Sequence, residues 1–228
     1  MKKNRYRAIF FDADRTLFDF DSGEETALRT LLGGIGVSLD AGMLENYRRI
    51  NKFLWNEFEH GRIAKKDIAP RRFREFLAAA GVSFDPFKAA EKYIDLLSEQ
   101  RALLPGAKEI CEYLSGKYVM YIVTNGMAEL QQRRFSKSGI IQFFRDVFIS
   151  ESLGAAKPDR VFYDEALKRA GVGREEVLAV GDSPSADILG ANRAGIDACY
   201  FSPDRIPLPE GMHAKYSISM LSELADFL

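Results

Sequence analysis

The sequence predicts an α/β protein built on a doubly wound parallel sheet, with an all-helical segment inserted after the first strand. Three observations favour this fold class. Short apolar runs without polar alternation recur along the chain, as in strands that are buried on both faces. Helical patterns separate most of these runs, which indicates right-handed βαβ units. One long segment, residues 21–103, has helical periodicity and no convincing strand.

Six apolar runs are the candidate strands. They are AIFF before Asp12, YVMYIV before Thr124, VFIS at residues 147–150, VLAV before Gly181, DACYF ending at Phe201, and YSIS at residues 216–219. Helices are predicted between them over residues 105–117, 127–140, 158–172 and 185–196. Ligands of such sheets bind beyond the carboxyl ends of the strands, where Asp12, Thr124 and Asp182 all lie.

The inserted segment, residues 21–103, is expected to form a helical domain, and residues 1–20 with 104–228 an α/β domain. Its first clear helix has apolar residues every three or four positions, as on one helical face: Met43, Tyr47, Ile50, Leu54 and Phe58. Two more helices are predicted over residues 68–81 and 85–100, the second with Asp85 as its N-cap. An insertion of about 80 residues has the size of a small domain.

Charge and composition exclude several classes of partner. Lys and Arg number 32 and Asp and Glu 33, so the net charge of −1 favours neither nucleic acid nor an anionic membrane. No apolar run approaches a membrane span, and the four apolar residues after the basic start MKKNRYR are too few for a signal-peptide core. We therefore expect a cytoplasmic protein. Cys111 and Cys199 are expected to be buried thiols, and His60 and His213 surface residues.

Two carboxylates, Asp12 and Asp14, stand at the tip of the first apolar run, in IFFDADRTLFDFD. Two like charges about 4 Å apart repel by about 4 kcal/mol at an effective dielectric near 20, so either this is a solvated acidic loop or a cation lies between them. In the second case Asp12 can act as a nucleophile beside Mg²⁺, and Asp14 as a general acid and base. Asp19 and Asp21 are expected to be surface charges on the loop that follows.

Three later segments offer the remaining parts of such a site. The Thr124 hydroxyl in YIVTNG can hold phosphate oxygens with nearby backbone N–H groups, and Lys157 in GAAKPD can supply a compact positive charge. Asp182 in VGDSPSAD can share Mg²⁺ with Asp12, while Asp187 can hold Lys157 in place. Each segment alone is also compatible with ordinary structure, namely a turn, a solvated lysine or an N-capping acid.

The order of the four segments is more specific than any one of them. Four motifs follow one another along the chain: strand-DxDxT, strand-TN, K-P and strand-GDxxxxD. Together they resemble the motif set of the haloacid dehalogenase (HAD) superfamily of phosphohydrolases, and the resemblance runs from Ile9 to the last strand. The helical insertion resembles the first type of cap domain in that superfamily. The resemblance implies a Rossmann-like core and a Mg²⁺-dependent phosphomonoesterase that forms an aspartyl-phosphate. An acid at position 14 favours phosphate over halide chemistry, because a halide leaves without a proton.

The resemblance also implies a role for each matching residue. Asp12 corresponds to the nucleophile and Asp14 to the acid/base, while the phosphate-binding residues are Thr124, Asn125 and Lys157. The Mg²⁺ ligands are Asp12, the backbone carbonyl of Asp14, and Asp182. Five segments further resemble the bacterial noncanonical pyrimidine 5′-nucleotidases: FFDADRTLFDFDS, NKFLWNEFEHGRI, VTNG, AKPD and VGDSPSADILGA. This second resemblance implies a nucleoside 5′-monophosphate as substrate. We expect a monomer or a homodimer.

Arg15 departs from that pattern, since these relatives usually carry Glu and many superfamily members Gly. Its guanidinium either tunes phosphate affinity or points outward to pair with Asp19 or Glu24. Candidate substrate residues are Phe18, Asn51, Lys52 and Trp55, although Trp55 is equally compatible with the core of the cap. Other functions stay open: a small sugar-phosphate or phosphoglycolate phosphatase or phosphomutase, a 2-haloacid dehalogenase, or a non-catalytic binding protein on the same fold.

Overall fold

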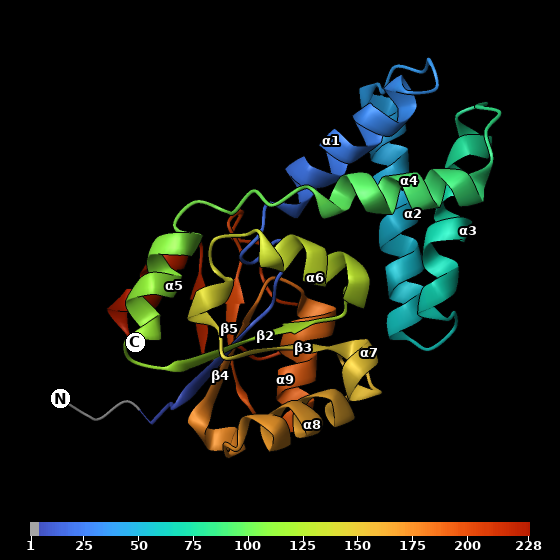
Figure 1. Cartoon of the computed structure of the whole chain (residues 1–228). Coiled ribbons are helices and arrows are strands. Elements are labelled where there is room, and N and C mark those ends of the chain that lie inside the picture. The colour runs from blue at the N-terminus through green and yellow to red at the C-terminus, as the bar shows by residue number, and fades with distance from the viewer. Residues whose placement is uncertain (1–4) are drawn as a thin grey trace. The chain divides into compact units, whose positions relative to one another are not determined.

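The structure is a computed structural model that describes residues 5–228. Residues 1–4 lie outside the described residues. They belong to the basic start MKKNRYR, which was predicted not to begin a signal peptide. The chain divides into two compact units, and Figure 1 shows their helices and strands. One unit contains the described residues up to Phe20 together with Arg101–Leu228, and the other is Asp21–Gln100.

The first unit contains a six-stranded sheet in the order β3-β2-β1-β4-β5-β6, and all of its neighbouring strands are parallel. The strands are β1 (Ala8–Phe11), β2 (Val119–Thr124), β3 (Asp146–Ile149), β4 (Val177–Gly181), β5 (Asp197–Phe201) and β6 (Tyr216–Ile218). This confirms the predicted fold class, with shifts of one residue at some strand ends. The chain order reverses between β1 and β4, the position at which such sheets bind ligands.

Helices cover both faces of this sheet because alternate residues of each strand point to opposite sides. Ile9 and Phe11 of β1 pack with α5, α6 and η4 on one face, and Ala8 and Phe10 pack with α7, α8 and α9 on the other (Figure 1). Burial of each phenylalanine contributes about 1.5–3 kcal/mol. The bounds are α5 (Ala107–Ser115), α6 (Ala128–Ser136), η1 (Ile141–Phe143), α7 (Ser150–Leu153), α8 (Arg160–Ala170), η2 (Arg174–Glu176), η3 (Pro184–Ile188), α9 (Leu189–Ala194) and η4 (Leu221–Asp226).

The chain leaves and re-enters the α/β unit as a short paired ribbon. The amide of Asp19 donates to the carbonyl of Ala102 at 2.9 Å, and the amide of Leu104 donates to the carbonyl of Leu17 at 2.9 Å. The two connections to the helical unit therefore start side by side. This pairing also places residues 101–103 with the sheet rather than with the helices.

The second unit consists of four helices: α1 (Phe20–Gly33), α2 (Ala41–Glu59), α3 (Lys65–Ala79) and α4 (Pro86–Ser98). Asp85 caps α4 as expected, since its carboxylate accepts from the amides of Phe87 and Lys88 at 2.8 and 3.1 Å. The sequence had not indicated α1. Because α1 begins at Phe20, Asp21 lies in its first turn rather than on a loop.

The interior of the helical unit combines aromatic rings with two buried charged residues, Arg72 and Glu24. The Arg72 guanidinium lies 5.4 Å from the ring centroid of Tyr47 and 4.9 Å from that of Tyr93. Asn51 accepts from Arg72 at 2.8 Å and donates to the buried Glu24 at 2.9 Å. One amide thereby links two charges that would be costly to bury unpaired.

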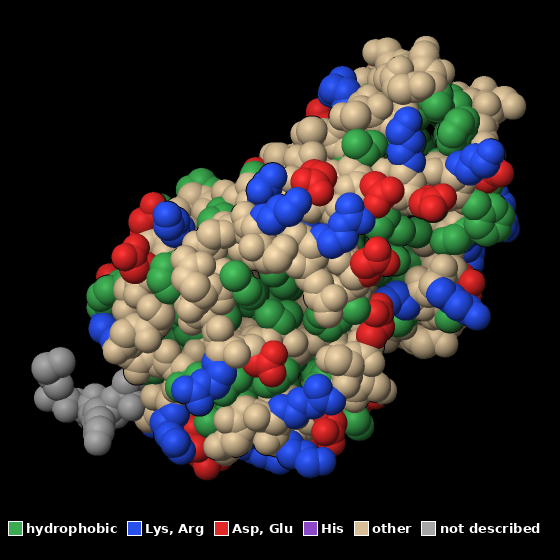
Figure 2. All heavy atoms as spheres, in the orientation of Figure 1, with side chains coloured by type: hydrophobic (Ala, Val, Ile, Leu, Met, Phe, Trp, Pro, Cys, Tyr) green, Lys and Arg blue, Asp and Glu red, His purple; other side chains and the backbone are tan. Residues whose placement is uncertain are grey.

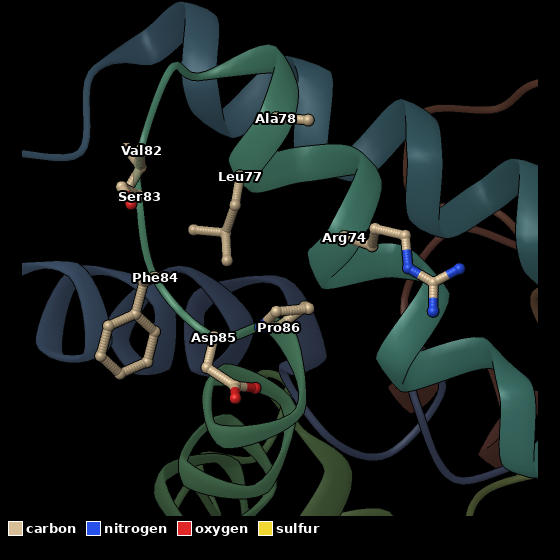
Figure 3. Close-up of a pocket in the computed structure, with 8 residues that line it drawn as sticks. All are labelled: Arg74, Leu77, Ala78, Val82, Ser83, Phe84, Asp85 and Pro86. Atoms are coloured by element: carbon tan, nitrogen blue, oxygen red, sulfur yellow. The ribbon is translucent and has the colours of Figure 1, made fainter.

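The surface of the molecule agrees with the balanced composition. Lys and Arg side chains are interspersed with Asp and Glu on the face shown in Figure 2. A hollow in the helical unit, between the end of α3 and the start of α4, is drawn in Figure 3; its lining residues are Arg74, Leu77, Ala78, Val82, Ser83, Phe84, Asp85 and Pro86. It contains none of the predicted site residues. Among the described residues, no helix has both the length and the apolar character that a membrane span requires.

Candidate active site

The sheet brings the predicted residues to one edge. β1 pairs in register with β2 on one side and with β4 on the other, so Asp12, Thr124 and Asp182 come to the same end of three adjacent strands. The amide of Asp12 donates to the carbonyl of Val180 at 2.8 Å, which holds Asp12 beside β4. Its side chain is 11% exposed. A carboxylate this buried requires a positive partner.

Lys157 supplies that partner. Its Nζ donates to Asp12 Oδ1 at 2.6 Å, to Asp187 Oδ1 at 2.6 Å and to the carbonyl of Val123 at 3.0 Å, and its side chain is 2% exposed. The segment that carries Lys157 is held by Asn125, whose side-chain amide donates to the Lys157 carbonyl at 2.8 Å and accepts from its amide at 2.9 Å. Asn125 thus contacts the lysine backbone, and its contact with phosphate stays a prediction.

Three carboxylates crowd around this single lysine. One oxygen each of Asp12, Asp182 and Asp187 lies within 4.8 Å of the other two. Burial raises the pKa of Asp12 well above its ordinary value, and repulsion by the other carboxylates adds to the rise while Lys157 opposes it. Burial and the charge of Asp187 raise the pKa of Asp182 to about 7. The cluster therefore has an excess of negative charge that a further cation would relieve.

For Lys157, attraction by neighbouring charges has a larger effect on the pKa than burial has, which is the reverse of Asp12. Burial lowers it, but the attraction of Asp12 and Asp187 outweighs burial and raises the pKa well above its ordinary value. The lysine is therefore charged under all ordinary conditions. It balances the charge of one of the three carboxylates, and a further cation would favour ionisation of the other two.

The free oxygens of the cluster fit a magnesium ion. Asp187 has both oxygens engaged, by Lys157 Nζ and by the amide of Ser183 at 3.0 Å. Asp12 and Asp182 each use one oxygen, the latter accepting from Thr16 Oγ1 at 3.3 Å. An oxygen of Asp12, an oxygen of Asp182 and the backbone carbonyl of Asp14 are the candidate ligands for this ion. These are the hard oxygen ligands that Mg²⁺ prefers.

Gly181 is required by the close approach of Asp187. A Cβ atom at position 181 would lie 2.4 Å from Cγ of Asp187, which is inside any normal contact distance. Gly181, the last residue of β4, and Asp182, which follows it, therefore have separate roles. The glycine admits Asp187 to the lysine, and Asp182 presents its carboxylate to Asp12.

Thr124 lies at the end of β2 and is 2% exposed. Its Oγ1 accepts from the amide of Gly126 at 3.0 Å and from Nε2 of Gln131 at 3.2 Å. Both contacts use the oxygen as an acceptor, so the hydroxyl hydrogen is left as a donor. A donor at this strand end is suited to a phosphate oxygen, as the sequence predicted.

The side chain of Asp14 has two partners that the sequence did not identify. Its Oδ2 accepts from Gln131 Nε2 at 2.8 Å, and its Oδ1 accepts from Arg134 Nη1 at 2.5 Å. Gln131 and Arg134 lie three positions apart on α6, between the buried Leu130 and Phe135. Two polar residues on the apolar face of a helix were the available signal, because buried polar groups need partners.

Arg15 occupies a position that favours glycine. Its φ of 66° is in the left-handed region, which accounts for the glycine common at this position in the resembled superfamily. The guanidinium lies 4.9 Å from the ring centroid of Phe20, and its charge opposes the rise in the pKa of Asp182. Arg15 thus acts electrostatically on the carboxylate cluster.

The candidate substrate residues fall into two groups. Phe18 is fully buried against Phe135, and Asn51 is buried between Glu24 and Arg72, so both have structural partners. Lys52 is exposed and Trp55 is half-buried, with its ring 5.7 Å from that of Phe58. Substrate contact stays a prediction for all four, and the exposed surface of Lys52 and Trp55 makes these two the better candidates.

Comparison with known proteins places the chain among relatives. The family model described as haloacid dehalogenase-like hydrolase matches residues 6–195. The chain is 35% identical over 225 residues to the HAD-hydrolase YfnB of Bacillus subtilis, with 98% of this chain and 96% of that protein covered. A crystal structure of YfnB, bound to magnesium and described as revealing interdomain movement, matches with a TM-score of 0.93 over 98% of this chain and 99% of that one.

Two further relatives carry a named activity. The chain is 35% identical to the pyrimidine 5′-nucleotidase PynA of Streptococcus pneumoniae, over 98% of this chain and 95% of that protein. It is 36% identical to the pyrimidine 5′-nucleotidase YjjG of Escherichia coli, over 96% of each. Both matches extend through the helical unit as well as the sheet.

Proposed function

Because this chain belongs to the haloacid dehalogenase-like hydrolase family, we propose that it is a Mg²⁺-dependent phosphomonoesterase that hydrolyses nucleoside 5′-monophosphates through an aspartyl-phosphate. The observation that carries the chemistry is the buried lysine shared by Asp12 and Asp187, next to Asp182. The nucleotide is supported by two pyrimidine 5′-nucleotidases at 35% and 36% identity over nearly the whole chain.

The proposed reaction has two steps that share one acid/base. A carboxylate oxygen of Asp12 attacks phosphorus, the ester P–O bond breaks, and Asp14 gives its proton to the departing oxygen. Asp14 then takes a proton from water, whose oxygen attacks phosphorus and breaks the bond to Asp12. Inorganic phosphate leaves, and both carboxyl groups return to their starting states.

The other residues hold charge and phosphate oxygens in place. Lys157 would stabilise negative charge on the transferring group, and the Thr124 hydroxyl would donate to one of its oxygens. Mg²⁺ would be held by Asp12, Asp182 and the backbone carbonyl of Asp14, and it would supply charge stabilisation to the phosphoryl group. The choice of metal is supported by the crystal structure of YfnB, which is described as bound to magnesium.

A panel of phosphate esters tests the proposal directly. We expect phosphate release from nucleoside 5′-monophosphates in the presence of Mg²⁺, and its loss on addition of a chelator. The panel includes sugar phosphates, phosphoglycolate and 2-haloacids, with chloride and isomerised sugar phosphate measured as separate products. Turnover that is unchanged by the chelator, or absent on every nucleotide, would overturn the proposal, and preferred turnover of a sugar phosphate would replace the substrate.

We expect Trp55→Ala to raise KM for nucleoside monophosphates about 10-fold, with a much smaller change for a phosphate ester that lacks a base. Loss of one aromatic face removes about 1–3 kcal/mol of base stacking. The measurement is the ratio of the two KM values in variant and wild type. Phe53→Ala is the matched control, because Phe53 lies two residues away on α2 and is 48% exposed. Equal KM changes for both substrates would remove Trp55 from the base site.

The metal-free protein is expected to lose stability as the pH rises from about 4 towards 7. A carboxyl group whose pKa is raised on folding stabilises the folded state only while it is protonated. For Asp182 this contribution is present below the unfolded value near 3.9 and is lost as the pH passes its folded value of about 7. Melting temperatures at pH 5 and pH 8, with chelator and with Mg²⁺, measure the effect.

Added Mg²⁺ should restore stability mainly at pH 8, where the carboxylates are ionised. Asp182→Asn is the control, because the amide does not titrate in this range and is a weaker metal ligand. Its melting temperature should fall less between the two pH values and respond less to Mg²⁺. An equal pH dependence and an equal Mg²⁺ response in the variant would show that Asp182 is neither the titrating group nor a ligand.

A further inference from the structure

We propose that Arg134 and Gln131 of α6 are positioning residues that hold the carboxylate of Asp14 for its acid/base role. The inference rests on the proposed function, because it assigns new residues to the same site. It starts from the two contacts described above, in which each oxygen of Asp14 receives a separate donor. A carboxylate held at both oxygens has a fixed direction.

The arginine is itself rigid. Its side chain is 2% exposed, and its guanidinium lies 4.9 Å from the ring centroid of Phe18 and 5.6 Å from that of Phe20. Stacking on two rings limits the rotation of the planar group, and burial excludes water as a competing partner. Asp14, by contrast, has 23% of its side chain exposed. The donor is therefore the fixed member of the pair, and the carboxylate is the member that can reach a substrate.

Gln131 connects this pair to the predicted phosphate site. Its Oε1 accepts from Arg134 at 3.0 Å, while its Nε2 donates both to Asp14 Oδ2 and to Thr124 Oγ1. One amide thus fixes the acid/base and the phosphate-binding hydroxyl relative to each other. Its approach depends on Gly126, where a Cβ atom would lie 2.3 Å from Nε2. The glycine of Thr-Asn-Gly therefore makes room for Gln131.

The chemistry of the donors defines what they do. Guanidinium and amide N–H groups can only donate, so they bind the ionised carboxylate and orient the form that accepts a proton from water. To protonate a leaving oxygen, Asp14 has to carry the proton on one oxygen and turn that oxygen away from its donor. Arg134 and Gln131 would set the resting position from which this turn begins and to which Asp14 returns in each cycle.

A double-mutant cycle tests the inference. Arg134→Met and Arg134→Lys are made in the wild type and in Asp14→Asn, and kcat and KM are measured with a nucleoside 5′-monophosphate and with p-nitrophenyl phosphate. We expect Arg134→Met to lower kcat on the nucleotide about 10- to 100-fold with KM changed less than about twofold, because acid/base catalysis contributes about 10²–10⁴-fold in total. Arg134→Lys, which keeps the charge but loses the planar group stacked on Phe18 and Phe20, should have a kcat between those of Arg134→Met and the wild type.

The decisive comparison is with Asp14→Asn. If Arg134 acts through Asp14, Arg134→Met should lower kcat less than about twofold further in that background, because the two residues share one interaction. The loss should also be smaller with p-nitrophenyl phosphate, whose phenolate leaves with little need of a proton. Arg133→Met, one residue away on α6, is the matched control and should leave kcat near that of the wild type.

The outcomes separate this inference from the proposed function. Wild-type protein that releases no phosphate from any ester overturns the proposed function and this inference with it. Active wild type in which Arg134→Met lowers kcat by the same factor with and without Asp14 overturns this inference alone, as does a rise in KM at unchanged kcat. Circular dichroism checks folding, and if Arg134→Met does not fold, Gln131→Met carries the same cycle with Gln132→Met as its control.

Discussion

Replacement of Asp12 by Asn is expected to reduce the hydrolysis of nucleoside monophosphates by a factor on the order of 10⁴ or more, as for other covalent nucleophiles. The amide cannot form the covalent bond to phosphorus that the carboxylate forms. It also withdraws the negative charge that Lys157 contacts at 2.6 Å and that Mg²⁺ would share. Phosphate release measures the loss, and mass spectrometry of protein quenched during turnover tests for the phosphorylated form.

The matched control is Asp204→Asn, which removes a carboxylate from an exposed loop residue of the same unit. It should leave both turnover and the phosphorylated form unchanged. Circular dichroism of Asp12→Asn should match that of the wild type, because the change also relieves repulsion among three crowded carboxylates. Turnover near the wild-type rate in Asp12→Asn would refute the covalent mechanism while leaving the family membership intact.

We expect Lys157→Met to destabilise the fold by about 3–5 kcal/mol and to abolish turnover. The methionine has a similar length, so the cavity cost is small, but Asp12 and Asp187 lose the ammonium that both contact. Removal of one partner from a buried ion cluster leaves an uncompensated buried charge, and this typically costs about 3–5 kcal/mol of folding free energy. Urea unfolding in the absence of Mg²⁺ measures the stability, and phosphate release measures the activity.

Lys168→Met provides the comparison for this variant. Lys168 also pairs with a carboxylate, that of Glu165 at 3.5 Å, but its side chain is 76% exposed. Exposed pairs contribute little, so no measurable change in unfolding or turnover is expected. If Lys157→Met unfolds at the same urea concentration as Lys168→Met, the buried cluster does not stabilise the fold as its geometry indicates.

The sheet and the approach of Asp12 to Asp182 at one of its edges were predictable from the sequence because both follow from local patterns. Runs such as AIFF and VLAV are apolar on both faces, which together with the helices between them favours a covered parallel sheet. Once the strands are parallel, the residues after them meet at one edge. That is why Asp12 and Asp182 were expected together and why the structure brings one oxygen of each within 4.8 Å of the other.

Other features depend on contacts between distant residues, which local patterns do not encode. Arg134 and Asp14 are separated by 120 positions, and nothing in either segment alone specifies the pair. Asn51 was a candidate for substrate because it lies near Lys52 and Trp55. The sequence did not indicate that its amide links Glu24 to Arg72, residues 27 and 21 positions away. The first helix of the insertion was missed because its first turns are polar and mask the apolar face that follows.

The paired ribbon at residues 17–19 and 102–104 makes the helical unit exchangeable. Because both connections start side by side, residues 21–100 could be replaced by another segment of any length whose ends lie close together, without a change in strand order. Every residue proposed here for phosphate chemistry lies outside the exchanged segment. A different helical unit could therefore be joined at this one attachment point, with all the residues proposed for phosphoryl transfer kept.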